Sequence, residues 1–98
     1  MIFTIKNNQK QNLVTLTRKI GYRFLNEDKE KKINLIRPLE RNGYPRFHIY
    51  LKFNSQKLIF NLHLDQKRPS YKGFPAHAGE YKGGVIEKEA ERIKQILQ

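Results

Sequence analysis

Residues 46–53 have the sequence RFHIYLKF, and residues 57–65 have the sequence KLIFNLHLD. Both runs alternate apolar and polar side chains, which is typical of a half-buried β-strand because successive strand residues point to opposite faces of a sheet. The short polar segment between them suits a reverse turn. Together the two runs predict an antiparallel β-hairpin, which is the strongest strand signal in the chain.

The register of this hairpin follows from matching its two apolar rows. The tightest pairing that keeps apolar residues out of the turn sets Phe53 opposite Leu58 and leaves residues 54–57 as the loop. A register shifted by two residues changes the partners but still leaves both histidines of the hairpin on one face. In the tightest pairing the couples on the polar face are Tyr50 with Asn61, His48 with His63, and Arg46 with Asp65.

Helices are expected on both sides of the strands. Asn12 is a favoured N-cap, Gly21 is a favoured helix stop, and the apolar residues between them share one helical face. An apolar stripe at helical spacing also runs through residues 86–97. These patterns predict helices over residues 12–20 and 85–97, although the β-branched residues of the first segment also suit a strand.

The whole of residues 1–98 is expected to form one α+β domain. Residues 1–6 and 22–25 have short extended patterns, residues 33–37 form a further strand, and residues 27–32 are a mixed-charge turn. The expected fold is an antiparallel sheet of three or slightly more strands in the order α-β-β-β-α. Both helices should pack on the face formed by Phe47, Ile49, Leu51, Phe60, Leu62 and Leu64.

The chain is strongly basic, with 20 Lys and Arg against nine Asp and Glu and a formal net charge of +11. Residues 1–26 and 37–82 carry the entire surplus, while the remaining residues are neutral overall. A surplus of this size favours association with phosphate polymers through counterion release. Solubility or an anionic membrane surface would also explain it, but the neutral helix over 85–97 argues against the membrane.

Several classes of protein are excluded by composition. The chain has no cysteine, so disulfides, thiolate zinc sites and a cysteine nucleophile are all excluded. No apolar run approaches the roughly 18 residues of a membrane span, and residues 1–6 do not resemble a signal peptide. We therefore expect a cytoplasmic protein without membrane contact.

His48 and His63 are the sharpest candidates for chemistry. Two neighbouring imidazoles suit acid–base catalysis, because one can take a proton from a ribose 2′-hydroxyl while the other protonates the leaving oxygen. Tyr50 and Asp65 share their face and are further catalytic candidates.

Two alternatives stay open for this pair. Together with Asp65, and with His77 or Glu80 from the following loop, it could bind zinc or another divalent metal. It could instead consist of hydrogen-bonded residues without a chemical role.

Residues 66–84 lack periodicity and interleave cations with aromatic residues, a combination that neutralises phosphates while stacking bases. The aromatic residues could alternatively fold this loop back over the core. The candidate nucleic-acid-binding residues of the chain are Arg46, Lys52, Lys67, Arg68, Tyr71, Lys72, Tyr81 and Lys82.

The helix end LTRKIGY at residues 16–22 and the strand-borne histidine in Arg46-Phe47-His48 resemble a known family. Over residues 12–98 the element order is similar to that of HicA-type messenger-RNA interferases, a variant of the double-stranded-RNA-binding domain. This resemblance implies RNA cleavage involving His48 and a protein antitoxin as partner. The chain departs from the family where Arg46-Phe47 replaces a Gly-Ser pair, in its longer loop, and in lacking a lysine cluster at the last helix.

The predicted function is therefore nucleic-acid binding, with RNA favoured over DNA and with no cofactor. One alternative is a toxin-like endoribonuclease that uses His48 and His63 and pairs with an antitoxin or a second copy of itself. A further alternative is a metal-dependent hydrolase or metal-binding protein.

Overall fold

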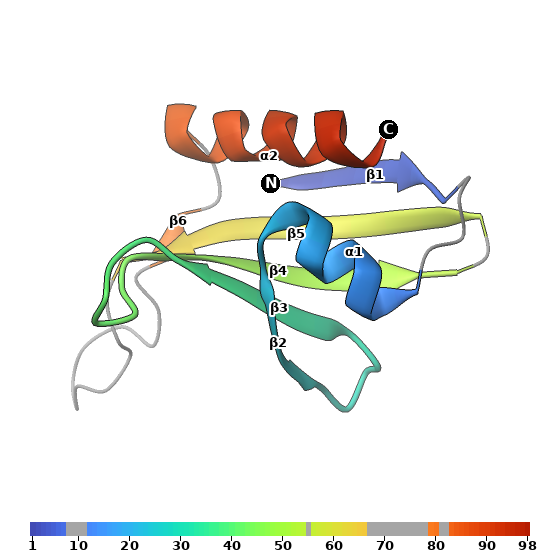
Figure 1. Cartoon of the computed structure of the whole chain (residues 1–98), viewed down its shortest axis with the longest axis horizontal. Coiled ribbons are helices and arrows are strands. Elements are labelled where there is room, and N and C mark those ends of the chain that lie inside the picture. The colour runs from blue at the N-terminus through green and yellow to red at the C-terminus, as the bar shows by residue number, and fades with distance from the viewer. Residues whose placement is uncertain (8–11, 55, 67–78, 81–82) are drawn as a thin grey trace.

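The computed structural model describes residues 1–7, 12–54, 56–66, 79–80 and 83–98. In these ranges the chain is an α+β domain, as expected from its sequence (Figure 1). The elements in chain order are β1 (Ile2–Lys6), α1 (Leu13–Ile20), β2 (Arg23–Glu27), β3 (Ile33–Pro38), β4 (Arg46–Phe53), β5 (Lys57–Asp65), β6 (Gly79–Glu80) and α2 (Gly84–Leu97).

The strands form one antiparallel sheet, and five of those described follow the spatial order β1-β5-β4-β3-β2. The short β6 pairs with the end of β5, on the edge where β1 pairs with its beginning. The sheet thus exceeds the three or slightly more strands expected, and the α-β-β-β-α order is corrected, since β1 precedes the first helix and β2 adds a full strand. All five residues of β2 are exposed, so its sequence lacks the alternation that marks a half-buried strand.

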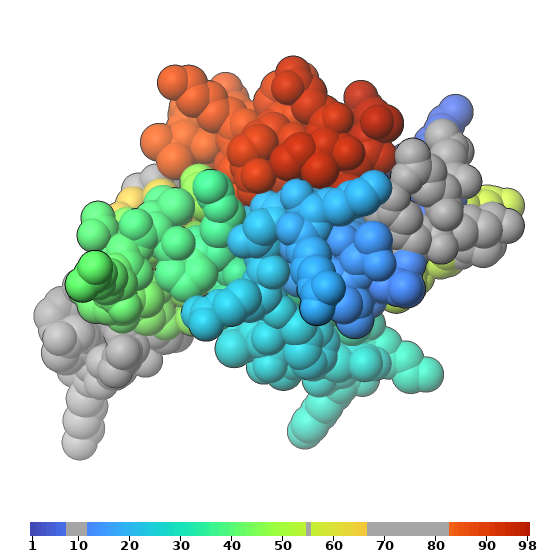
Figure 2. All heavy atoms as spheres, viewed as in Figure 1, coloured from blue at the N-terminus to red at the C-terminus, as the bar shows by residue number. Residues whose placement is uncertain are grey.

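The apolar rows of β4 and β5 face both helices, as predicted. Leu16 and Ile20 of α1 and Ile93 of α2 belong to the same buried cluster as these rows. In Figure 1 α2 runs along β1 and β5, and the space-filling view shows α1 and α2 on the same side of the molecule (Figure 2). The predicted sheet residues of this core, all buried, are Phe47, Ile49, Leu51, Phe60, Leu62 and Leu64.

Both predicted helices are confirmed to within one residue at each end. The Asn12 side chain accepts a hydrogen bond of 2.9 Å from the amide of Thr15, which caps the first turn of α1. Gly21 ends this helix in the left-handed conformation, with φ of 81°. Neither helix of the described chain has the length and apolar character needed to cross a membrane.

The opposite side of the sheet, here called the open face, packs against neither α1 nor α2. It is defined by the residues that alternate with the core rows, and His48 and His63 are buried on it. The side chains placed on the open face by the strand pairings include Lys6, Arg23, Asn34, Ile36, Arg46, His48, Tyr50, Lys52, Lys57, Ile59, Asn61, His63 and Asp65.

Candidate functional site

The hairpin register predicted from the sequence is confirmed. His48 pairs with His63, Arg46 with Asp65, and Phe53 with Leu58. The two imidazole rings have centroids 4.7 Å apart and are tilted by 39°. Matching of apolar rows alone therefore brings two histidines together at the centre of the open face.

Asp65 connects the two histidines. Its Oδ1 lies 2.8 Å from His63 Nε2, and its Oδ2 lies 3.3 Å from His48 Nδ1. Arg46 Nε also donates to Oδ2, at 3.1 Å. Two rings and one guanidinium thus share one carboxylate, and these four side chains form what we call the histidine cluster.

Asn34 is part of this arrangement and was not identified from the sequence. Its Oδ1 lies 2.9 Å from His48 Nε2, and its side-chain amide donates to the carbonyl of Lys32 at 3.5 Å. Asn34 reaches the cluster because β3 pairs with β4, which sets it opposite Tyr50. Asn34 could have been identified from the sequence, because it is a polar residue inside the otherwise apolar run Ile33-Asn34-Leu35-Ile36.

Tyr50 packs on the two histidines. Its ring centroid lies 4.5 Å from that of His48 and 5.3 Å from that of His63, and both contacts are stacked. The three rings therefore form a small aromatic group at the centre of the open face.

The carboxyl group of Asp65 is held in its charged form. Burial raises the pKa of Asp65, but hydrogen bonds from His48, His63 and Arg46 and the charge of His63 together lower it further. The result is a pKa well below the usual range of aspartate. The histidine cluster therefore contains a permanent negative charge at neutral pH.

This geometry supports two kinds of chemistry. Facing imidazoles around a carboxylate can transfer protons, as expected for two-histidine cleavage of RNA. The same nitrogen and oxygen atoms are also ligands for a divalent metal, because His48, His63 and Asp65 bring their ligand atoms within 4.8 Å of one another. The side chains of the two histidines are 10% and 5% exposed, so a small ion fits the site more readily than a polymer does.

The other predicted site residues are distributed as follows. Lys52 lies on the open face and is exposed, as its strand parity predicted. Glu80 belongs to β6, and its backbone pairs with Leu64 of β5. The structure describes the backbone of Glu80 but not its side chain. The candidates that fall outside the described residues are Lys67, Arg68, Tyr71, Lys72, His77, Tyr81 and Lys82.

A second polar cluster lies on the helical side of the sheet and was also missed. Glu89 of α2 is 4% exposed and accepts a hydrogen bond of 2.6 Å from the hydroxyl of Tyr22. Arg37 and Arg92 form ion pairs with the same carboxylate at 3.2 and 2.7 Å. Burial and the neighbouring Glu89 raise the pKa of the Tyr22 hydroxyl well above its usual range, so the hydroxyl keeps its proton. These contacts connect α2 to the segment that follows α1.

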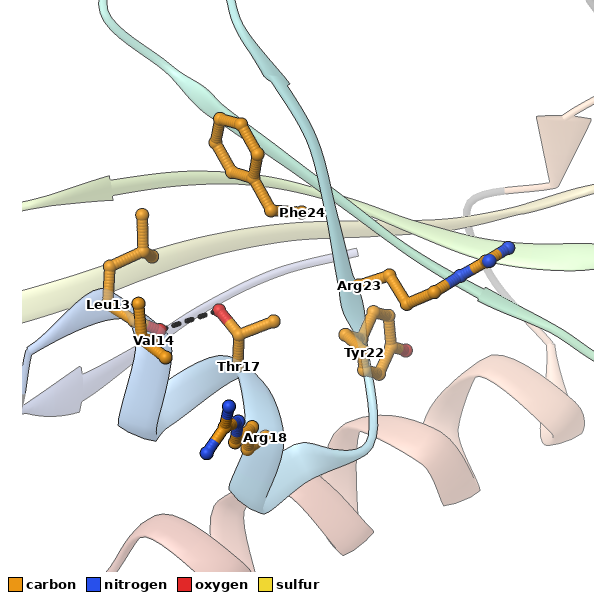
Figure 3. A pocket seen from close by; sticks show the side chains of 7 residues that line it. All are labelled: Leu13, Val14, Thr17, Arg18, Tyr22, Arg23 and Phe24. Carbon is orange, nitrogen blue, oxygen red and sulfur yellow. Dashed lines mark hydrogen bonds between the residues drawn. The ribbon is translucent and has the colours of Figure 1, made fainter.

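An apolar groove of about 470 Å³ lies between α1 and β2 (Figure 3). Val14 and Phe24 on its walls are 61% and 54% exposed. We assign it no role, because nothing in the structure indicates an occupant. Its lining residues are Leu13, Val14, Thr17, Arg18, Tyr22, Arg23 and Phe24.

Comparison with models of known protein families found no match, and neither curated proteins nor solved structures gave one. The resemblance to HicA-type interferases and double-stranded-RNA-binding domains therefore stays a prediction.

Proposed function

We propose that this protein binds RNA through the open face of its sheet. The observation that carries the proposal is the charge of that face. In the described strands its only carboxylate is Asp65, which already contacts two histidines and an arginine. The cations of this face are Lys6, Arg23, Arg46, Lys52 and Lys57.

The aromatic group at the centre of the face supports RNA as the polymer. Tyr50 stacks on His48 and His63 and is itself partly exposed, so this face combines aromatic rings with its cations. Sequence-tolerant recognition of single strands commonly combines a positively charged surface with such rings. Single-stranded RNA presents both the phosphates and the splayed bases that this face would take.

The proposal is tested by fluorescence anisotropy with a labelled single-stranded RNA at several salt concentrations. Binding should weaken steeply with salt, and Lys52→Ala and Lys57→Ala should each lower the slope of log K against log salt by about 0.7. Lys88→Ala is the matched control, because Lys88 is an exposed lysine of α2 on the other side of the sheet. Salt-independent binding, or equal effects of all three variants, would contradict the proposal.

RNA cleavage by the two histidines is a second candidate, favoured by their shared contact with Asp65. It requires no metal, since one imidazole would accept the 2′-hydroxyl proton and the other would donate to the leaving oxygen. Cleavage should then persist in EDTA and disappear in His63→Gln. Intact RNA after prolonged incubation with the wild-type protein would remove this candidate.

A further inference from the structure

We propose that His48, His63 and Asp65 bind one divalent transition-metal ion of the Zn²⁺ class, whether or not the open face binds RNA. Their ligand atoms lie within 4.8 Å of one another. Nitrogen and oxygen ligands about 2.0–2.1 Å from a tetrahedral Zn²⁺ lie roughly 3.3 Å apart, so small rotations of the rings would close this set around an ion. Two imidazoles and one carboxylate favour Zn²⁺, Co²⁺ or Ni²⁺ over Mg²⁺, which prefers oxygen ligands.

Asn34 provides the support that a metal-binding histidine needs. Such a histidine almost always donates its second ring N–H to an oxygen, which fixes the tautomer and the ring orientation. Asn34 Oδ1 stands 2.9 Å from His48 Nε2, and the bond from Asn34 to the Lys32 carbonyl sets which end of its amide faces the ring. With Nε2 held by Asn34, Nδ1 is the ring nitrogen of His48 that faces Asp65.

This nitrogen and the Asp65 carboxylate are close enough to share one ion. His48 Nδ1 lies only 3.3 Å from a carboxylate oxygen of Asp65. Metal binding releases the protons of its ligands, so an ion could replace the proton that this nitrogen and this carboxylate share. The same ion would be within reach of His63, whose Nε2 lies 2.8 Å from the other carboxylate oxygen of Asp65.

The three ligands are held by regular secondary structure. His48 and His63 are opposite one another in paired strands, and Asp65 follows two residues later on the same face of β5. Sites built on strands keep their geometry better than sites on loops, so little ordering is needed when the ion binds. Three protein ligands also leave a position for water or another group, as in an open zinc site.

Arg46 affects which ligand would occupy the open position on the ion. Its guanidinium neutralises Asp65 at 3.1 Å, so the charge of a bound ion would be left uncompensated in a largely buried place. An uncompensated buried charge is costly, and an anionic ligand such as phosphate relieves it. This last step rests on the proposed function, because the phosphate would come from RNA.

Metal binding is tested on the whole protein, stripped with EDTA and dialysed into metal-free buffer. Calorimetric titration with Zn²⁺ should show one ion per chain, and Co²⁺ should give the intense visible bands of a four-coordinate site. Mg²⁺ at the same concentration should give no heat. Absence of both the Zn²⁺ heat and the Co²⁺ bands would overturn the inference, whatever the outcome of the RNA experiment.

Variants locate the ion. Asp65→Asn and His63→Gln remove a ligand while nearly keeping its volume, and each should abolish binding. Asn34→Ala should weaken binding by about 10–100-fold and leave the Co²⁺ bands visible at saturation, as expected for a positioning residue. Glu40→Gln, which removes an exposed carboxylate after β3, should bind as the wild type does.

A measurement without variants covers the case in which these proteins fail to fold. Two-bond ¹H–¹⁵N spectra of the wild-type histidine rings distinguish metal-bound, protonated and free nitrogens. Addition of Zn²⁺ should shift the Nδ1 signal of His48 and the Nε2 signal of His63. If both signals are unchanged at saturation, or if folded Asp65→Asn binds as tightly as the wild type, the ion binds elsewhere. Shifted signals would also separate this inference from metal-free catalysis, because a coordinated nitrogen cannot accept a proton.

Discussion

Asp65 makes the stability of the protein depend on acid pH. Its pKa is lowered in the folded state, so the folded chain binds a proton there less readily than the unfolded chain does. The stabilisation is present above the unfolded pKa of about 3.9 and is lost as pH falls through the lower folded value. The free energy of unfolding should therefore fall more steeply below about pH 4 in the wild type than in Asp65→Asn.

Urea unfolding at pH 7, 4 and 3 measures this difference. At pH 7 we expect Asp65→Asn to be less stable by about 1–3 kcal/mol, because its charged hydrogen bonds are lost. Parallel pH profiles for the two proteins would show that the contacts of Asp65 do not stabilise the folded state. Glu40→Gln serves again as the exposed-carboxylate control.

Among the acidic residues of α2, Glu89 should be the one whose substitution destabilises the protein most. Its buried carboxylate accepts bonds from Tyr22, Arg37 and Arg92, and its removal leaves these groups without their shared partner. We expect Glu89→Ala to destabilise the protein by about 3 kcal/mol, at the low end for broken buried pairs since both arginines are partly exposed. Thermal unfolding should show a change of at most about 0.5 kcal/mol for the exposed control Glu91→Ala.

At the scale of elements, two glycines should respond oppositely to alanine. Gly21 ends α1 with φ of 81°, where a Cβ is strained, so Gly21→Ala should cost about 1–2 kcal/mol. Gly84 begins α2 without a positive φ and with open space around a Cβ, so Gly84→Ala should stabilise by about 0.4–1 kcal/mol. Chemical denaturation of both proteins measures the two signs, and a stable Gly21→Ala would contradict the assigned cap.

The elements also show what sequence patterns can and cannot predict. The register of β4 and β5 was predictable because two apolar rows admit few alignments that bury both. The contact of Asn34 with His48 was not, since it depends on pairing between β3 and β4, which local patterns do not specify. Glu89 reads in the sequence as an acidic residue near a helix start, and only the packing of α2 reveals that it is buried.

On the scale of the whole molecule, the two sides of the sheet should differ in their contact with RNA. On the helical side, α2 balances its three glutamates with Lys88, Arg92 and Lys94, whereas the open face carries five cations and one carboxylate, Asp65, in its described strands. Bound RNA should therefore protect Lys52 and Lys57 from reductive methylation and leave Lys88 reactive. Mass spectrometry of the labelled lysines provides the measurement, and equal protection of all three would indicate binding without a preferred face.

Strand β1 has a consequence for the order in which the chain acquires its structure. It is synthesised before its hydrogen-bonding partner, the first half of β5, which follows more than 50 residues later in the chain. A growing chain on the ribosome therefore carries an unpaired strand until the hairpin has emerged, and closing that long loop adds an entropic barrier late in folding. The sheet should consequently assemble around β3, β4 and β5, with its N-terminal edge added last.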